Sequence, residues 1–75
     1  MIAQNDIYVA KQLELNGRQY WILSEPNSGG WRAWVTEVRA DGGSDEMGID
    51  ATAETRSAAD ELAERKLRRL LRGKN

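Results

Sequence analysis

The 75-residue chain contains no cysteine and no histidine. Without cysteine it forms neither a disulfide nor a thiolate zinc site, which excludes a small disulfide-rich secreted scaffold and fits a reducing compartment. Without histidine it lacks the commonest metal ligand and the usual general base near neutral pH. We therefore expect no catalytic residues, no metal site and no cofactor, and we do not expect an enzyme.

The chain also lacks a long apolar run and an excess of one charge. Its 11 basic and 12 acidic residues leave a net charge of -1, so no global field attracts nucleic acid or an anionic membrane. No stretch approaches the roughly 20 apolar residues that span a bilayer, and the start, MIAQNDIYVAK, has no signal-peptide pattern. We expect a cytoplasmic protein with one small domain over residues 1–75 and no membrane contact.

Three segments have the pattern of β-strands. Odd positions from 7 to 15 are apolar with one polar interruption, and Asn16-Gly17 directly after them is a strong signal for a type I′ hairpin turn. The second strand covers about 18–24, a loop rich in turn-forming residues follows, and the third strand covers 31–39.

The rest of the chain divides into a polar connection and one helix. Residues 40–54 have only Met47 and Ile49 as apolar anchors, so we expect a long loop there. After it, apolar residues recur at helical spacing: Ala59, Leu62, Ala63, Leu67, Leu70 and Leu71. Ser57, with Asp60 three residues on, has the pattern of an N-cap with a capping box, and Thr55 is a rival cap. The expected fold is α+β, a three-stranded antiparallel sheet with one C-terminal helix packed on one face, in the order β-β-β-α.

This arrangement leaves one face of the sheet without a helix. A two-residue turn at Asn16-Gly17 fixes the pairing of Leu13 with Tyr20, which sets the face of every residue in the first hairpin. Trp31 and Trp34 lie three apart in the third strand, so their side chains point to opposite faces and only one of them lies on the face away from the helix. The candidate partner-binding residues of that face, with these two as alternatives, are Tyr8, Trp21, Leu23, Trp31 and Trp34. Such a patch is typical of a surface that binds a protein partner or a second copy of the chain. The alternative is that Met47 and Ile49 of the loop, or the N-terminal residues, fold over it.

A second candidate surface lies on the helix. Four arginines share one helical face at the spacing i, i+3, i+4 and i+7: Arg65, Arg68, Arg69 and Arg72. A basic stripe of this kind tracks a phosphate backbone, so binding of RNA or DNA is the alternative function. The plainer interpretation is a solvated face whose positive charges complement the helix dipole.

The acidic residues of the polar connection are a weaker candidate. Asp41, Asp45, Glu46 and Asp50 supply oxygen ligands of the kind that hard cations prefer. Their spacing differs from that of a calcium-binding loop, because Gly43 occupies the third position. We expect a solvated acidic segment and no bound metal.

Two motifs resemble a known family. The run SEPNSGGWRAWV at 24–35, then a glycine-bearing loop, then TRSAA at 55–59 opening an amphipathic helix, resembles the HicB-like antitoxin domain over about residues 20–71. That family has a β-β-β-α core likened to a truncated ribonuclease H fold, with a pattern of the kind G-G-[WY]-x-A/V-x-V followed by G-x-T-x-x-E-A. The resemblance implies a non-catalytic protein-binding domain.

The sequence departs from the family pattern at several positions. EVRADGG at 37–43 replaces the proline and glycine usual after the third strand, and Ala58 stands where the family has a glutamate. We expect no helix-turn-helix or ribbon-helix-helix segment after the helix, although many such antitoxins carry one. These departures point to an orphan relative rather than a working antitoxin.

Overall fold

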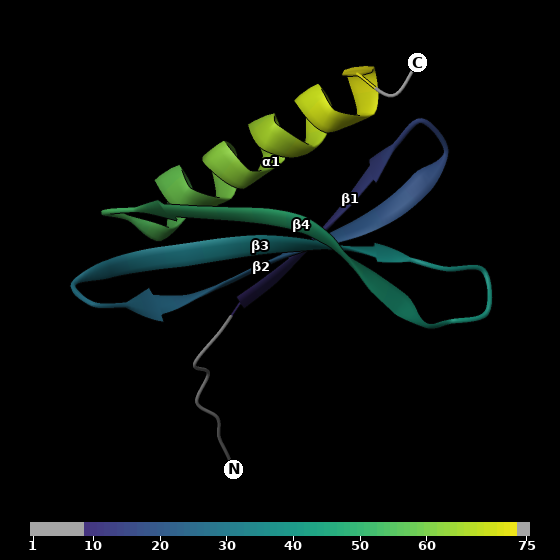
Figure 1. Cartoon of the computed structure of the whole chain (residues 1–75). Coiled ribbons are helices and arrows are strands. Elements are labelled where there is room, and N and C mark those ends of the chain that lie inside the picture. Colours follow the sequence, from purple (N-terminus) through teal and green to yellow (C-terminus); the bar gives the residue numbers. More distant parts are fainter. Residues whose placement is uncertain (1–8, 74–75) are drawn as a thin grey trace, which may run out of the picture.

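The computed structural model describes residues 9–73, which form a four-stranded antiparallel sheet with one helix lying along one of its faces (Figure 1). The elements are β1 (Val9–Leu15), β2 (Arg18–Asn27), β3 (Gly30–Val38), β4 (Ser44–Ala53) and α1 (Arg56–Gly73). The strands lie in the sheet in chain order, so each strand pairs with its neighbour in the sequence. The predicted α+β class, with one helix on an antiparallel sheet, is confirmed. No helix within residues 9–73 is both long enough and apolar enough to cross a membrane.

The predicted number of three strands is wrong, because residues 44–53 of the expected long loop form β4. The chain reverses between Arg39 and Gly43, where the Arg39 N–H donates to the Gly43 carbonyl at 2.7 Å. β4 then runs antiparallel to β3, with a bulge at the level of Gly48, which has a φ of 73°. Four side chains of β4 pack on the helix side of the sheet: Met47, Ile49, Ala51 and Ala53. The observed order is therefore β-β-β-β-α.

Two-residue turns set the register of the first three strands. Asn16 and Gly17 have φ values of 53° and 78°, as a type I′ turn requires, and the predicted pairing of Leu13 with Tyr20 is confirmed. Ser28 and Gly29 repeat this conformation, with φ values of 43° and 83°. The expected loop before the third strand is therefore a tight turn, and β2 and β3 both extend into it.

The core lies between the sheet and α1. Among residues 10–73, nine hydrophobic side chains are buried in it: Tyr20, Ile22, Ala33, Val35, Ile49, Ala51, Ala59, Ala63 and Leu67. Ala59 and Ala63 lie one helical turn apart and place only small side chains against the sheet, whereas Leu67 is fully buried one turn later. Burial of this apolar surface is the main source of stability for so small a chain.

Thr55 is the N-cap of α1. Its Oγ1 accepts a hydrogen bond from the Ala58 N–H at 3.1 Å, which satisfies one of the unpaired amide groups of the first turn. The interpretation of Ser57 as the cap is wrong, because Ser57 lies inside the helix. The cap fixes where the chain leaves β4 and turns back over the sheet.

Candidate protein-interaction face

No element within residues 9–73 covers the face of the sheet that is turned away from α1 (Figure 1). The register of the strands places the side chains of this face in rows that run across the sheet. One row contains Ala10, Leu23, Trp34 and Asp50, and the next contains Gln12, Trp21, Thr36 and Glu46. Each row is apolar or neutral over the first three strands and acidic at β4. We call the apolar part the open-face patch, which consists of Ala10, Trp21, Leu23, Trp34 and Thr36.

Trp34 belongs to the open-face patch and Trp31 does not. Trp34 lies directly opposite Leu23 on the neighbouring strand, whereas Trp31 packs against the core on the helix side. The pairing of β3 with β2 is regular between the two tryptophans, so the alternation of a strand keeps their side chains on opposite faces. Trp31, one of the five predicted partner-binding residues, is therefore placed with the core.

Two further expectations concern this face. The alternative that Met47 and Ile49 fold over it is wrong, because both side chains belong to β4 and pack on the opposite side of the sheet. Tyr8 lies outside the described residues, and so do the N-terminal residues that are the other possible cover of this face.

The open-face patch is partly exposed. Trp21, Leu23 and Trp34 are all half-buried. The guanidinium carbon of Arg32 lies 4.8 Å from the centroid of the Trp34 ring, which is the distance of a cation–π contact. A shallow hollow of about 320 Å³ lies in the patch and is lined by Ala10, Trp21, Leu23, Thr36 and Ser44.

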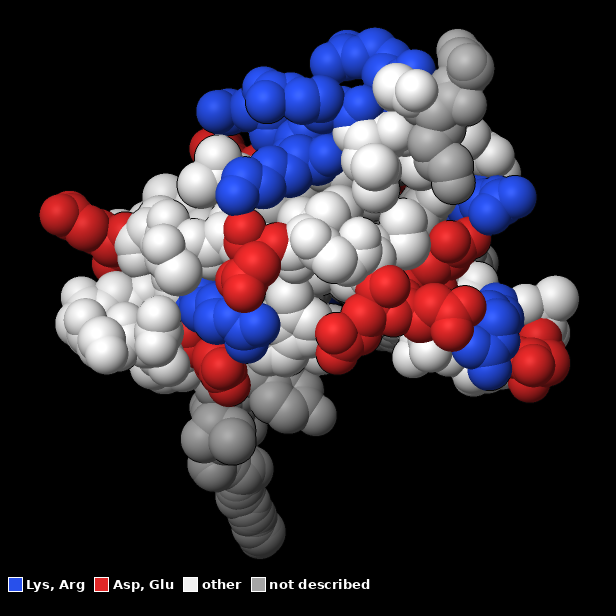
Figure 2. Space-filling view, in the orientation of Figure 1, with Lys and Arg blue, Asp and Glu red and all other residues white. Residues whose placement is uncertain are grey.

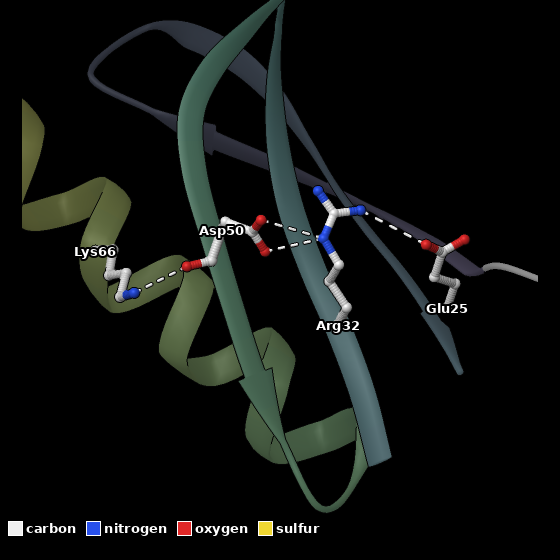
Figure 3. A network of polar contacts seen from close by, with 4 residues as sticks. All are labelled: Glu25, Arg32, Asp50 and Lys66. Carbon is white, nitrogen blue, oxygen red and sulfur yellow. Dashed lines mark hydrogen bonds and ion pairs between the residues drawn. The ribbon is translucent and has the colours of Figure 1, made fainter. Parts of the chain in front are cut away.

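A polar network borders the patch on the β3–β4 side (Figure 3). The Nε of Arg32 donates to the two carboxylate oxygens of Asp50 at 3.0 and 3.1 Å, and its Nη1 lies 3.5 Å from an oxygen of Glu25. The hydrogen bond to Asp50 raises the pKa of Arg32 above its ordinary value. Because these groups are partly exposed, the ion pairs contribute little stability. Their effect is positional, since they hold the guanidinium over Trp34.

The four arginines of the predicted basic stripe are exposed on α1. Figure 2 shows basic side chains gathered over the helix and acidic side chains mostly over the sheet below it. Arg68 pairs with Glu64, with Nη2 and Oε2 at 2.7 Å. Within residues 9–73, no carboxylate forms an ion pair with the other three: Arg65, Arg69 and Arg72.

Of the four acidic residues considered as cation ligands, three pair with arginines, and no ion pair joins Glu46 to another residue within 9–73. Asp41 and Asp45 both contact Arg39, and Asp50 contacts Arg32. Within the described part of the chain, no three His, Cys, Asp or Glu side chains are grouped so that they would hold a metal ion. The arrangement is that of a solvated surface with exposed ion pairs, which contribute little stability.

The sequence did not predict an apolar groove between β4 and the last turns of α1. Seven residues line this cavity of about 470 Å³: Met47, Gly48, Ile49, Lys66, Arg69, Leu70 and Gly73. Leu70 is 40% exposed beside it and is the only large hydrophobic side chain of residues 10–73 that is so exposed. The groove exists only if β4 is a strand. The signal that could have revealed it is the alternation of Met47, Ile49, Ala51 and Ala53 in the sequence.

Comparisons of the chain with protein-family models, with curated proteins and with solved structures find no match. The resemblance to the HicB-like antitoxin domain therefore rests on the two short motifs at 24–35 and 55–59 and stays a prediction.

Proposed function

We propose that the chain is a non-enzymatic protein-interaction module of the cytoplasm that binds a protein partner, or a second copy of itself, through the open-face patch. One observation carries this proposal. A single helix covers one face of the sheet, and the other face presents Trp21, Leu23 and Trp34 with no covering element among residues 9–73. The HicB-like resemblance implies the same kind of role.

The chemistry of the face supports the proposal. Its centre is apolar and contains two tryptophans, a residue type that often dominates the binding energy of interfaces. Its border is charged, with Arg32, Glu25 and Asp50 on one side, and an apolar centre with a polar rim is the usual anatomy of a protein interface. Half-burial holds the tryptophan rings in place before binding, so less side-chain entropy is lost when a partner docks.

A charge placed at the centre of the patch tests the proposal. Trp21→Lys removes the ring and adds a cation, whereas Gln19→Lys adds the same charge on the same strand at an exposed position beside the patch. Tagged wild-type and variant chains would be purified from their own cells, and bound proteins and oligomeric mass would be measured by mass spectrometry and light scattering. We expect the wild type and Gln19→Lys to retain the same partner, and Trp21→Lys to lose it while keeping its circular dichroism spectrum.

Two results would contradict the proposal. The first is a wild-type chain that is monomeric and retains no specific protein. The second is a Trp21→Lys variant that unfolds, because that result would assign Trp21 to the core rather than to a binding surface.

A second candidate function, nucleic-acid binding by α1, is favoured by the three exposed arginines that pair with no described carboxylate: Arg65, Arg69 and Arg72. It predicts binding to labelled single-stranded or duplex probes that weakens steeply as salt is added. Replacing the three arginines with glutamine should abolish this binding. No change in fluorescence anisotropy at low salt would exclude the function.

A further inference from the structure

The sheet has two edge strands, β1 and β4. They differ in whether a bulge or a side chain blocks the backbone N–H and C=O groups that point away from the sheet. An exposed edge strand is a template for pairing with another chain unless bulges, charges or neighbouring groups block it. β4 is blocked in this way. Its pairing with β3 is interrupted by a bulge, and the Lys66 side chain on α1 donates a hydrogen bond to the outward carbonyl of Asp50 at 2.8 Å (Figure 3).

β1 carries two charged side chains, Lys11 and Glu14, but within residues 9–73 it has no bulge, and no side chain bonds its outward backbone groups. It is a regular strand of seven residues that contains no glycine, no proline and no bulge. The pair Leu15–Arg18 flanks the two-residue turn and is hydrogen-bonded, so the odd residues of β1 direct their N–H and C=O groups toward β2. Ala10, Gln12 and Glu14 direct theirs outward. No hydrogen bond joins the backbone groups of these three residues to another residue within 9–73.

We propose that β1 is a dimerisation edge, on which β1 of a second copy pairs antiparallel about a twofold axis. The two four-stranded sheets then become one continuous sheet. The proposal uses backbone groups at the edge, so it does not rest on the function proposed for the open-face patch.

A second copy is the occupant because the segment Gln12-Leu13-Glu14 is complementary to itself. With the axis at Leu13, this leucine lies opposite Leu13 of the second copy, at a position where the two Cβ atoms approach most closely. Gln12 lies opposite Glu14 of the second copy, and the symmetry repeats this pair of amide and carboxylate on the other side of the axis. All three pairs are favourable, and no like charges meet directly.

Burial at the edge supports the same register. Leu13 and Leu15 lie on the helix side of β1 and are only half-buried in one copy. Pairing about Leu13 places Leu13 against Leu13 of the second copy and Leu15 opposite Lys11 of the second copy, so the aliphatic part of the lysine covers Leu15. The ammonium group of Lys11, which lies 3.8 Å from Glu64 on the helix side, stays at the surface of the new seam. The two open-face patches then lie on the same side of the joined sheet.

Proline substitutions on the two edge strands test which of them forms the dimer. The Gln12 N–H points outward, so Gln12→Pro removes a donor that dimerisation needs and no bond between β1 and β2. Thr52 has the same outward position on β4. The two-residue turn at Ser28-Gly29 directs the backbone groups of the even residues of β3 toward β2, so Trp31 and Ala33 bond to Ala53 and Ala51, and Thr52→Pro is the matched control. Sedimentation equilibrium should show a wild-type dimer, a dissociation constant about tenfold or more weaker for Gln12→Pro, and an unchanged constant for Thr52→Pro.

Single cysteines provide a second test that does not depend on the folding of a proline variant. The chain has no cysteine of its own, so Leu13→Cys introduces the only thiol. Under mild oxidation Leu13→Cys should form a disulfide-linked dimer rapidly, whereas Gln12→Cys should not, because Gln12 lies opposite Glu14 and not opposite itself. The Leu13→Cys cross-link should also form in the presence of Trp21→Lys, because it reports on the β1 edge and not on what the open-face patch binds.

Three outcomes would overturn the inference. A wild-type chain that is monomeric at every concentration tested would do so, and so would cross-linking that is equal for the two cysteine variants. The third is a dimer that Trp21→Lys dissociates and Gln12→Pro leaves intact, because that result would move self-association from the β1 edge to the open-face patch.

Discussion

Replacement of Leu67 by alanine should remove a large part of the stability of the fold. Leu67 is fully buried at the centre of the contact between α1 and the sheet, where it is one of the largest core side chains. A buried leucine replaced by alanine costs about 2–5 kcal/mol, because apolar transfer energy is lost and a cavity remains. At about 0.05–0.15 kcal/mol per residue, a chain of 75 residues has a total free energy of unfolding of about 4–11 kcal/mol. The substitution therefore removes roughly half of it.

The same helix provides the control. Leu70 lies one turn away at the rim of the groove and is 40% exposed, so Leu70→Ala leaves no closed cavity and should cost about 1 kcal/mol or less. Both variants would be unfolded in urea, with the transition followed by circular dichroism and by tryptophan fluorescence. Equal losses of unfolding free energy for the two variants would refute the placement of α1, because they would mean that Leu67 and Leu70 are covered alike.

Three further predictions concern single groups. Thr55→Ala should lower the free energy of unfolding by about 1 kcal/mol through loss of the cap, whereas Ser57→Ala should change it by less than about 0.5 kcal/mol; the reverse order in urea melts would make Ser57 the cap. Burial, with a smaller effect of Glu37, raises the pKa of Tyr20 above its ordinary value of about 10, so stability should be constant below that pH and fall as the pH rises through the folded-state pKa. Tyr20→Phe should lose this slope in alkaline urea melts, and a slope that persists would assign it to another group. Ser24→Ala should be neutral or stabilising in thermal melts, because the buried Ser24 Oγ has no hydrogen-bond partner among residues 9–73, and a loss above about 1 kcal/mol would show that the hydroxyl is bonded.

The elements that the sequence predicts well are those whose signal is local. Asn16-Gly17 specifies a turn with two positive φ angles, and a two-residue turn leaves only one register for β1 and β2. The apolar stripe of α1 likewise follows from helical spacing alone. Both predictions depend on the geometry of neighbouring residues and not on distant contacts.

β4 was missed because its signal is weak at every position. Two of its four inward residues, Ala51 and Ala53, are small, and its outward residues include acidic side chains that favour a loop interpretation. The glycine at the bulge interrupts the pattern further. Pairing with β3 supplies the stability that the local sequence does not, and a single sequence does not reveal such pairing.

The candidate face was predicted in part for the same reason. Trp21 and Leu23 follow from the register of the first hairpin, and the structure places both away from α1. The choice between Trp31 and Trp34 depends on which face of β3 meets the helix, and the turn at Ser28-Gly29 decides it. The protection of the β4 edge by Lys66 joins residues far apart in the sequence, so no local pattern could have indicated it.

The meander topology separates two stages in the folding of the chain. Each strand pairs with the strand that precedes it, so the sheet forms from contacts of low sequence separation and can grow outward from its tight turns. The apolar face of that sheet stays exposed to solvent until α1 packs on it, because the helix that covers it comes after all four strands in the sequence. Docking of α1 is then the step that makes folding cooperative. Substitutions in α1 should accelerate unfolding more than they slow folding, whereas substitutions in the hairpin turns should slow the formation of the sheet itself.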